Sequence, residues 1–199
     1  MESVMLALGR NMHADLALVQ RARANDRAAF NEIVLRYKQK VYRFIRRMVN
    51  RDVDAEDLTQ ETFVRAYTSL ASFQNKASLN TWLFRIATNL CIDFSRKKSS
   101  KDVSLTTDSD DEEGATWDMP DTSFEPQKML MQSELAVYVE KAIGLLPDKM
   151  RTVILLYDVE NLSYEEIMAI VGCPLGTVKS RLFHARMNLR EQLTPYLKA

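Results

Sequence analysis

The segment from Gly176 to Glu191, GTVKSRLFHARMNLRE, concentrates positive side chains on one predicted helix. Its cationic or potentially cationic residues are Lys179, Arg181, His184, Arg186 and Arg190, and no acidic residue precedes Glu191. Apolar residues recur every three or four positions and predict a buried stripe on the opposite side. Ammonium and guanidinium groups on the remaining face suit phosphate oxygens and base edges. The segment predicts either a polyanion-binding helix or a solvated basic face of an ordinary bundle.

The residues that precede this helix favour the first alternative. Ser163 and Glu166 have the spacing of a capping box, which predicts a helix that begins at Ser163. Gly172 can take a positive φ and end that helix, and Pro174 fits the start of the next one. A short helix, a tight turn and a longer basic helix are typical of a helix-turn-helix, whose second helix enters the DNA major groove. We expect Lys179, Ser180, Phe183 and His184 to approach bases, and Arg181, Arg186 and Arg190 to bind phosphates or pair with acids on the preceding helices.

Enzymatic chemistry finds no support in the sequence. The chain has only two His and two Cys, and it lacks a glycine-rich phosphate loop and a metal-binding His motif. Cys91 lies within an apolar helical stripe and Cys173 lies at a helix start, so two free thiols are the simplest interpretation. We expect no catalytic residue, no metal site, no cofactor and no small-molecule substrate.

The supporting elements are predicted to be helical throughout. The 199 residues include 46% hydrophobic residues but only five Gly and five Pro, and apolar residues recur with the helical period. Helices are expected over about residues 15–49, with a break near Asn25 and Asp26, and over 52–69, 79–98, 128–146 and 150–157. The fold class is all-α: two small helical domains, residues 14–98 and 134–199, joined by a flexible acidic linker, 99–133, after a tail of residues 1–13.

Charge is distributed unevenly along the chain although the net charge is zero. Residues 1–101 contain 18 Lys and Arg against 10 Asp and Glu, whereas residues 102–133 contain one against nine. A basic domain and a basic helix in one chain suggest a polyanion partner for both. No basic n-region precedes the short apolar run at the N-terminus, and no apolar run is long enough to span a membrane. We therefore expect a cytoplasmic protein without membrane insertion.

Two separate segments resemble the same family. Residues 54–98 contain D-x-x-Q-E-x-F at Asp57 to Phe63 and T-W-L-x-R-I-A at Thr81 to Ala87, and they resemble region two of bacterial extracytoplasmic-function sigma factors. Residues 146–191 resemble region four of these RNA polymerase specificity subunits. Together with the helices before residue 54, the resemblance covers all but about the first dozen residues.

The resemblance implies three binding surfaces. Contacts to core RNA polymerase, through the clamp helices of its largest subunit, are implied for Asp57, Leu58, Gln60, Glu61 and Phe63; the C-terminal domain would meet the beta flap. Capture of the minus-ten element of promoter DNA is implied for Phe73, Gln74, Asn75, Lys76, Ser78, Asn80, Arg85 and Asn89. Binding of the minus-thirty-five element is implied for Thr177, Lys179, Ser180, Arg181, Phe183, His184 and Arg186.

Some features stay open or depart from the family pattern. His184 stands where many members have Arg, which would make minus-thirty-five binding sensitive to pH. We expect Trp82 in the core, whereas Phe84 faces outward with no assigned role. The acidic linker is either a nucleic-acid mimic in the polymerase cleft or a solvated tether.

The resemblance also implies partners and a role. We expect an anti-sigma factor that holds the protein inactive, and control of a stress or envelope response. The competing hypothesis is an autonomous helix-turn-helix regulator that binds duplex DNA tightly without polymerase, commonly as a dimer.

Overall fold

The computed structural model describes residues 14–74, 77–102 and 126–197, and in these ranges the regular secondary structure is entirely helical. A helix over residues 14–23 is followed by α2 (Arg27–Val49), α3 (Asp52–Ser69), the short 3₁₀ turn η1 (Leu70–Ser72) and α4 (Leu79–Asp102). These elements form the N-terminal domain. The C-terminal domain contains α5 (Pro126–Gly144), α6 (Asp148–Ile154), the π-helical turn η2 (Leu155–Val159), α7 (Tyr164–Val171) and α8 (Leu175–Leu197). The prediction of two helical domains is confirmed.

The helix boundaries follow local sequence signals. Asp26 caps α2 by accepting a hydrogen bond from the Ala29 amide at 3.1 Å, and Asn50 ends that helix in the left-handed conformation. Acidic residues in the first turn of α3, including Asp52 and Asp54, complement the helix dipole. Pro126 occupies the first position of α5, where no amide donor is needed. Both ends of the predicted linker are therefore helical, and its central part, residues 103–125, lies outside the described residues.

The N-terminal domain is built around α2, α3 and α4, which pack against one another. Its core contains large side chains from all three helices, such as Phe44 and Ile45 of α2, Phe63 of α3 and Leu83 of α4. Phe44 meets Phe84 edge to face, with ring centroids 5.0 Å apart. The three helices thus form one compact support for the surface side chains of α3 and α4.

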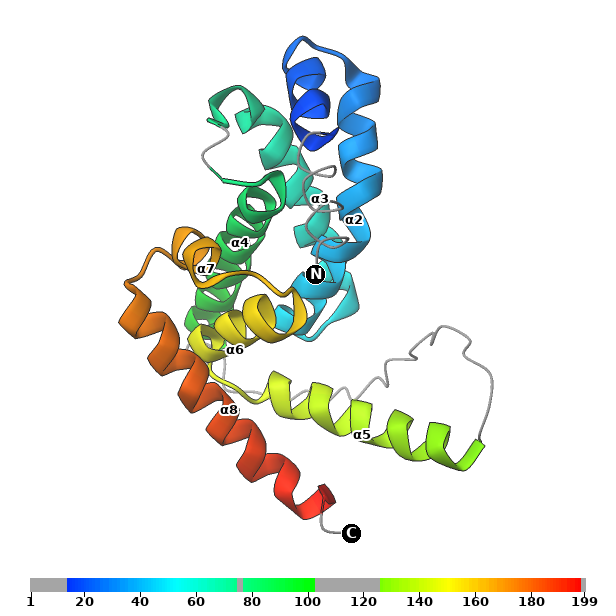
Figure 1. Ribbon diagram of the computed structural model, residues 1–199, viewed down its shortest axis with the longest axis vertical. Coiled ribbons are helices and arrows are strands. Elements are labelled where there is room, and N and C mark those ends of the chain that lie inside the picture. The colour runs from blue at the N-terminus through cyan, green and yellow to red at the C-terminus, as the bar shows by residue number, and fades with distance from the viewer. Residues whose placement is uncertain (1–13, 75–76, 103–125, 198–199) are drawn as a thin grey trace, which may run out of the picture.

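The C-terminal domain holds its last helix against three others. α8 packs on α5, α6 and α7 through the buried residues Val178, Leu182 and Ala185. Figure 1 shows α6 and α7 lying against α4 and the lower end of α2, while α5 and α8 extend away from the N-terminal domain. The two domains are therefore in direct contact, and within the C-terminal domain α7 is the element that packs most extensively on α4.

Candidate DNA-binding and polymerase-binding surfaces

The helix-turn-helix has the local geometry that its sequence predicts. The Glu166 amide donates to Ser163 Oγ at 3.2 Å, and the Ser163 amide donates to Glu166 Oε2 at 3.0 Å, which completes the capping box. Gly172 ends α7 with a φ of 64°. Pro174 precedes α8, and its carbonyl accepts the Thr177 amide at 2.9 Å. The turn between α7 and α8 is therefore set by backbone preferences of the residues in it.

The outer face of α8 is exposed as expected. The exposed residues include Lys179, Ser180, Phe183, His184, Arg186, Met187 and Arg190, whereas Thr177 and Arg181 are half-buried. Together with Tyr164 of α7 and Leu182, several of them line a shallow hollow of about 290 Å³. This surface combines cations with apolar and aromatic groups, a combination able to bind phosphates and base methyl groups.

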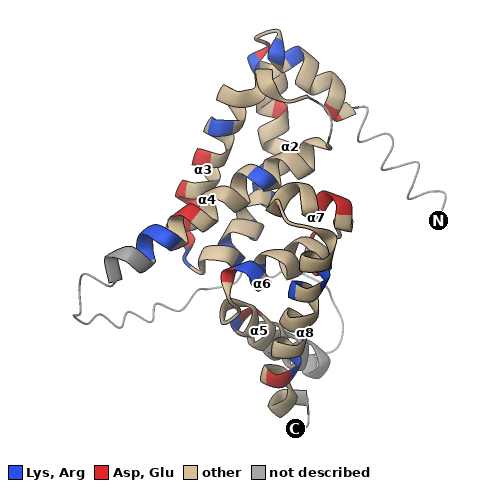
Figure 2. Cartoon of the chain, turned by 90° about the vertical axis from the view of Figure 1, so that its left-hand side faces the viewer, with Lys and Arg blue, Asp and Glu red and all other residues tan. Residues whose placement is uncertain are grey.

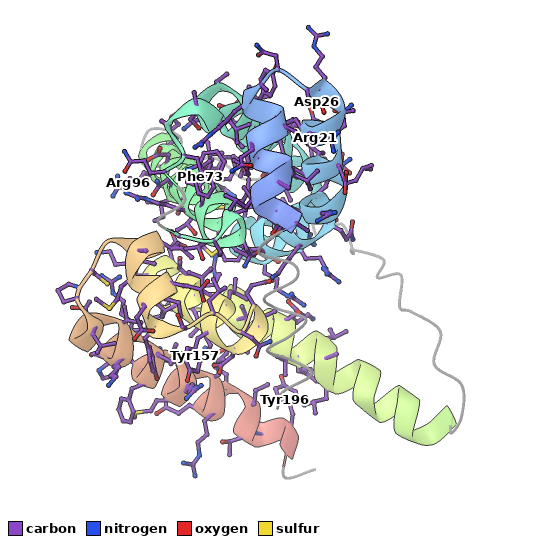
Figure 3. All side chains as sticks on the ribbon, turned by 45° about the horizontal axis from the view of Figure 1, so that its top comes forward. Arg21, Asp26, Phe73, Arg96, Tyr157 and Tyr196 are labelled. Carbon is purple, nitrogen blue, oxygen red and sulfur yellow. The ribbon has the colours of Figure 1, made fainter. Side chains whose placement is uncertain are left out.

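Aromatic and acidic neighbours position individual cations on this face. The Arg186 guanidinium donates to both carboxylate oxygens of Asp158, at 3.1 and 2.5 Å, and lies 5.3 Å from the centroid of the Tyr157 ring. The hydrogen bonds to Asp158 raise the pKa of Arg186. Arg186 was expected either to bind phosphates or to pair with an acid of the preceding helices, and in the structure it pairs with Asp158. Figure 3 shows the labelled Tyr157 in the C-terminal domain, close to the ribbon of α8.

Two other cations also have neighbours that orient them. Lys179 Nζ lies 5.5 Å from the Tyr164 ring centroid, and Arg181 Nη1 donates to Cys173 Sγ at 3.6 Å. The sequence did not indicate the tyrosine contribution, because Tyr157 and Tyr164 are stacked by tertiary packing, with centroids 4.9 Å apart.

The α3 residues divide between surface and core. Asp57 and Gln60 are exposed, and Glu61 accepts a hydrogen bond from Arg65 at 2.7 Å. Leu58 is half-buried, while Phe63 is buried in the domain core, so its side chain supports the surface from within. Of the five residues expected to bind polymerase, Asp57 and Gln60 are therefore exposed and Glu61 is partly exposed.

Exposed apolar residues lie on α2 and α3 and were not predicted as part of a binding surface. Leu35 of α2 is 81% exposed, and Val53 and Val64 of α3 are also exposed. Both helices pack against each other, so these side chains belong to the same half of the N-terminal domain. Large exposed apolar side chains of this kind are typical of protein-binding surfaces. The sequence could have indicated this exposure, because Leu35, Val53 and Val64 each lie off the periodic apolar stripe of their own helix.

The residues expected at the minus-ten element are brought to one end of α4. Ser78 Oγ accepts the Thr81 amide at 3.1 Å, and Asn80 Oδ1 accepts a hydrogen bond from Lys40 Nζ at 3.3 Å. Gln74, Arg85 and Asn89 are exposed. Asn75 and Lys76 lie outside the described residues.

Phe73 is buried rather than available as a stacking surface. Its ring packs on Trp82 with centroids 4.9 Å apart, and the Arg23 guanidinium lies 5.9 Å from its centroid. In Figure 3 the labelled Phe73 lies within the N-terminal domain, whereas Arg96 projects from it. The expectation that Trp82 belongs to the apolar packing agrees with this contact. Phe84, expected to face outward, is instead fully buried, with its ring against Phe44 and Lys40 of α2.

Neither a metal cluster nor a membrane-spanning helix was found in the part of the chain that the structure describes. No group of three or more His, Cys, Asp and Glu there could hold a metal ion. None of the described helices is both long and apolar enough to cross a bilayer.

Comparison with known proteins gives the same division of the chain. The family profile "Sigma-70 region 2" matches residues 33–101, and "Sigma-70, region 4" matches residues 136–189. An ECF RNA polymerase sigma-E factor from Haemophilus influenzae is 37% identical over 187 residues, covering 92% of this chain and 97% of the relative. The Escherichia coli K12 sigma-E factor is 36% identical over 188 residues, covering 92% and 96%.

Two solved structures share the arrangement of helices. One is RpoE from Bartonella quintana in complex with the anti-sigma factor NepR, with 28% identity, a TM-score of 0.64, and coverage of 83% of this chain and 96% of that one. The other is CnrH in complex with the cytosolic domain of CnrY, with 25% identity, a TM-score of 0.65, and coverage of 92% and 98%. The chain belongs to the ECF family of RNA polymerase sigma factors and is not an enzyme.

Proposed function

We propose that the two domains of this sigma factor, which directs promoter-specific initiation of transcription, bind different parts of the promoter and of the polymerase. The N-terminal domain would bind core RNA polymerase and the minus-ten element, and the C-terminal domain would bind the minus-thirty-five element and the beta flap. The observation that carries this proposal is the exposed face of α8, where Lys179, Ser180, Phe183 and His184 project from a capped helix-turn-helix.

For the polymerase contact we propose α3 with the adjoining part of α2. Asp57 and Gln60 supply exposed polar groups, and Leu35, Val53 and Val64 supply apolar area. A stable protein interface commonly combines an apolar centre with a polar rim. Leu58, Glu61 and Phe63 support this surface from partly or fully buried positions.

For the minus-ten element we propose the loop before α4 and the N-terminal half of that helix. Gln74, Ser78, Asn80 and Asn89 offer amide and hydroxyl groups that can bind base edges, and Arg85 offers a charge for the backbone. Asn75 and Lys76 keep the roles that the family resemblance implies. Phe73 acts through its packing on Trp82, which holds the loop against the domain.

For the minus-thirty-five element we propose direct contacts by the N-terminal part of α8. Lys179, Ser180, Phe183 and His184 face bases, while Thr177 and Arg181 approach the backbone. Arg186 is held by Asp158 and lies beside the proposed DNA surface, so it provides a fixed positive charge.

Control by an anti-sigma factor is also part of the proposal. The solved relatives RpoE of Bartonella quintana and CnrH are described in complex with NepR and with the cytosolic domain of CnrY, respectively. We extend such a partner to this chain, together with a stress-responsive role in the cytoplasm, where RNA polymerase works.

The decisive experiment is run-off transcription with purified core RNA polymerase on a library of genomic fragments. With the protein present we expect new, discrete start sites that share two upstream elements. The control replaces Lys179, Phe183 and His184 together with Ala and should lose these start sites while still binding polymerase. The absence of new start sites, combined with tight duplex binding by the protein alone, would contradict the proposal and favour an autonomous regulator.

A further inference from the structure

The helix over residues 14–23 contributes none of the residues proposed above to bind polymerase or DNA. It packs onto the N-terminal domain through Leu18, Val19 and Ala22, which are buried. Figure 1 shows it beside α2, which it joins through a short turn at one end of the domain. Near that turn its last residue, Arg23, reaches the segment that connects α3 to α4.

Arg23 makes two contacts with this connecting segment. Its Nε donates to the Leu70 carbonyl at 3.1 Å, and its guanidinium carbon lies 5.9 Å from the centroid of the Phe73 ring. Leu70 begins η1, and Phe73 is the residue directly after that turn. A hydrogen bond and a cation–π contact from one side chain therefore hold both ends of η1 against the first helix.

The contacts continue from Phe73 to α4. The Phe73 ring packs on Trp82, with centroids 4.9 Å apart, and the Phe73 amide donates to the Leu70 carbonyl at 3.2 Å. That carbonyl also accepts from Arg23, and a carbonyl oxygen has lone pairs for both bonds. Arg23, Leu70, Phe73 and Trp82 thus form one series of contacts from the first helix to α4, which we call the loop brace.

The loop brace lies next to residues that we assign to the minus-ten element. Gln74 follows Phe73 directly and is exposed, so a displacement of Phe73 also moves Gln74. On the other side of the loop, Ser78 Oγ accepts the Thr81 amide at 3.1 Å, which fixes Ser78 at the start of α4. A binding residue that is held in place before DNA arrives loses less conformational entropy on binding.

The helix that carries Arg23 is itself anchored at its other end. Tyr37 Oη of α2 donates to Asp15 Oδ2, and Arg36 Nη1 donates to Asp15 Oδ1 at 3.3 Å. With Asp15 bonded to α2 and Arg23 bonded to η1, this helix is tied to two different elements. Arg23 therefore extends from a fixed support and does not depend on a free chain terminus.

A direct contact between Arg23 and DNA is the alternative, because this end of the domain is basic. Figure 2 shows Lys and Arg positions gathered where the first helix turns into α2. One of these cations is engaged within the turn, since Arg21 lies 2.7 Å from Asp26, and both are labelled there in Figure 3. Loss of a phosphate contact lowers the salt dependence of DNA binding, whereas loss of a positioning contact does not.

We propose that Arg23 is a positioning residue for capture of the minus-ten element, and that it acts through the loop brace without touching DNA. The proposal rests on the minus-ten role suggested above for Gln74 and Ser78. Arg23 holds the Leu70 to Phe73 turn, Phe73 holds the start of the loop against Trp82, and Gln74 is thereby presented to the non-template strand.

The loop brace is tested without DNA through the fluorescence of Trp82. The chain contains two Trp, so Trp117→Phe leaves Trp82 as the single reporter. Arg23→Met removes the guanidinium but keeps an unbranched apolar stem, and Arg27→Met removes the same charge from an exposed position at the start of α2. We expect acrylamide to quench Trp82 more strongly in Arg23→Met, as in the wild type in Arg27→Met, and to an intermediate extent in Arg23→Lys, which retains a donor and a cation.

The effect on DNA is tested with holoenzyme reconstituted from core RNA polymerase. The probe is a fluorescent non-template strand that spans the minus-ten element of a promoter returned by the run-off assay, intact or with an abasic site at each position in turn. We expect Arg23→Met to bind the intact strand about three- to tenfold more weakly than Arg27→Met. An abasic site at a position where the wild type captures a base should cost Arg23→Met less, by a similar factor. The dependence of affinity on salt should be the same for both variants.

The outcomes separate the brace, its role and the proposed function. Equal quenching of Trp82 in Arg23→Met and Arg27→Met overturns the brace, and equal affinity for the intact strand overturns the positioning role. A loss that is the same with every abasic strand, with a weaker salt dependence, assigns Arg23 to a phosphate contact and also overturns it. An equal loss of affinity for core polymerase reduces Arg23 to a general role in folding. The proposed function is overturned by a different result, the absence of new start sites when the wild-type protein is added to core polymerase.

Discussion

At the scale of single residues, the chemistry of this sigma factor is set by neighbours that lie far away in sequence. Arg186 is bound by Asp158, and Lys179 lies over the Tyr164 ring. Each contact restricts a long, flexible side chain before DNA arrives, so less conformational entropy is lost on binding. Lys179 and Arg186, two of the exposed cations of α8, are thus partly ordered before DNA binds.

Replacement of Lys179 with Ala should weaken recognition of the minus-thirty-five element. The loss of a base or phosphate contact of this kind costs about 1–3 kcal/mol. Lys149→Ala is the matched control, because it removes the same charge from an exposed position on α6 of the same domain. Promoter affinity of the reconstituted holoenzyme, measured across salt concentrations, checks the prediction, and equal losses for the two variants would contradict it.

The two cysteines should differ sharply in reactivity. Burial, with a smaller contribution from Asp148, raises the pKa of Cys91 to about 12, so its thiol stays protonated at pH 8. Cys173 is half-buried beside the Arg181 guanidinium. We expect a disulfide reagent to modify one thiol rapidly in the native protein and both after unfolding. Cys173→Ser removes the rapid phase if this assignment is right, and Cys91→Ser removes it if the assignment is wrong.

At the scale of elements, the helix-turn-helix depends on one backbone conformation. Gly172 has a φ of 64°, and a Cβ added there would meet no atom within 4 Å. The requirement for glycine is therefore conformational and does not come from crowding. A Cβ added at Gly176 would also meet no atom within 4 Å, but Gly176 lies inside α8 and has an ordinary φ.

A pair of glycine substitutions separates these two cases. Gly172→Ala should lower the free energy of unfolding by about 1–2 kcal/mol, because alanine is strained in the left-handed region. Gly176→Ala should be neutral or should raise it by up to about 1 kcal/mol, because alanine favours the helix. Urea unfolding measures both, and Gly172→Asn, which tolerates the left-handed conformation, should recover part of the loss. A loss of similar size at both positions would contradict this account.

At the scale of the whole molecule, Arg151 joins the two domains. Its guanidinium donates to the carbonyls of Ile143, Gly144 and Leu146 at the end of α5 and the loop that follows, and to Met48 O of α2 at 2.6 Å. Burial lowers the pKa of Arg151, and Asp148 opposes this effect. One partly buried cation therefore satisfies free carbonyls at helix ends of both domains.

Replacement of Arg151 with Met should destabilise the protein by about 2–4 kcal/mol, since it leaves several partly buried carbonyls without this donor. Arg151→Lys should recover little of the lost stability, because one ammonium group cannot reach all the carbonyls that surround the planar guanidinium. Arg96→Met, at an exposed position, is the control and should change stability little. Calorimetry of the three variants tests the prediction, and equal melting temperatures for Arg151→Met and Arg96→Met would refute it.

The sequence by itself determined the helices, their caps and the division into two domains. Those features depend on local preferences, such as the Ser163 to Glu166 capping box and the left-handed residue at Gly172, and on the period of apolar residues along each helix. The exposed face of α8 was predictable for the same reason. Only the tertiary structure decided that Phe84 is buried, that Arg186 pairs with Asp158 and that Glu166 bonds to Thr81. Each of these contacts joins elements that are far apart in sequence, and helical periodicity shows which side of a helix a residue occupies but not which element packs against that side.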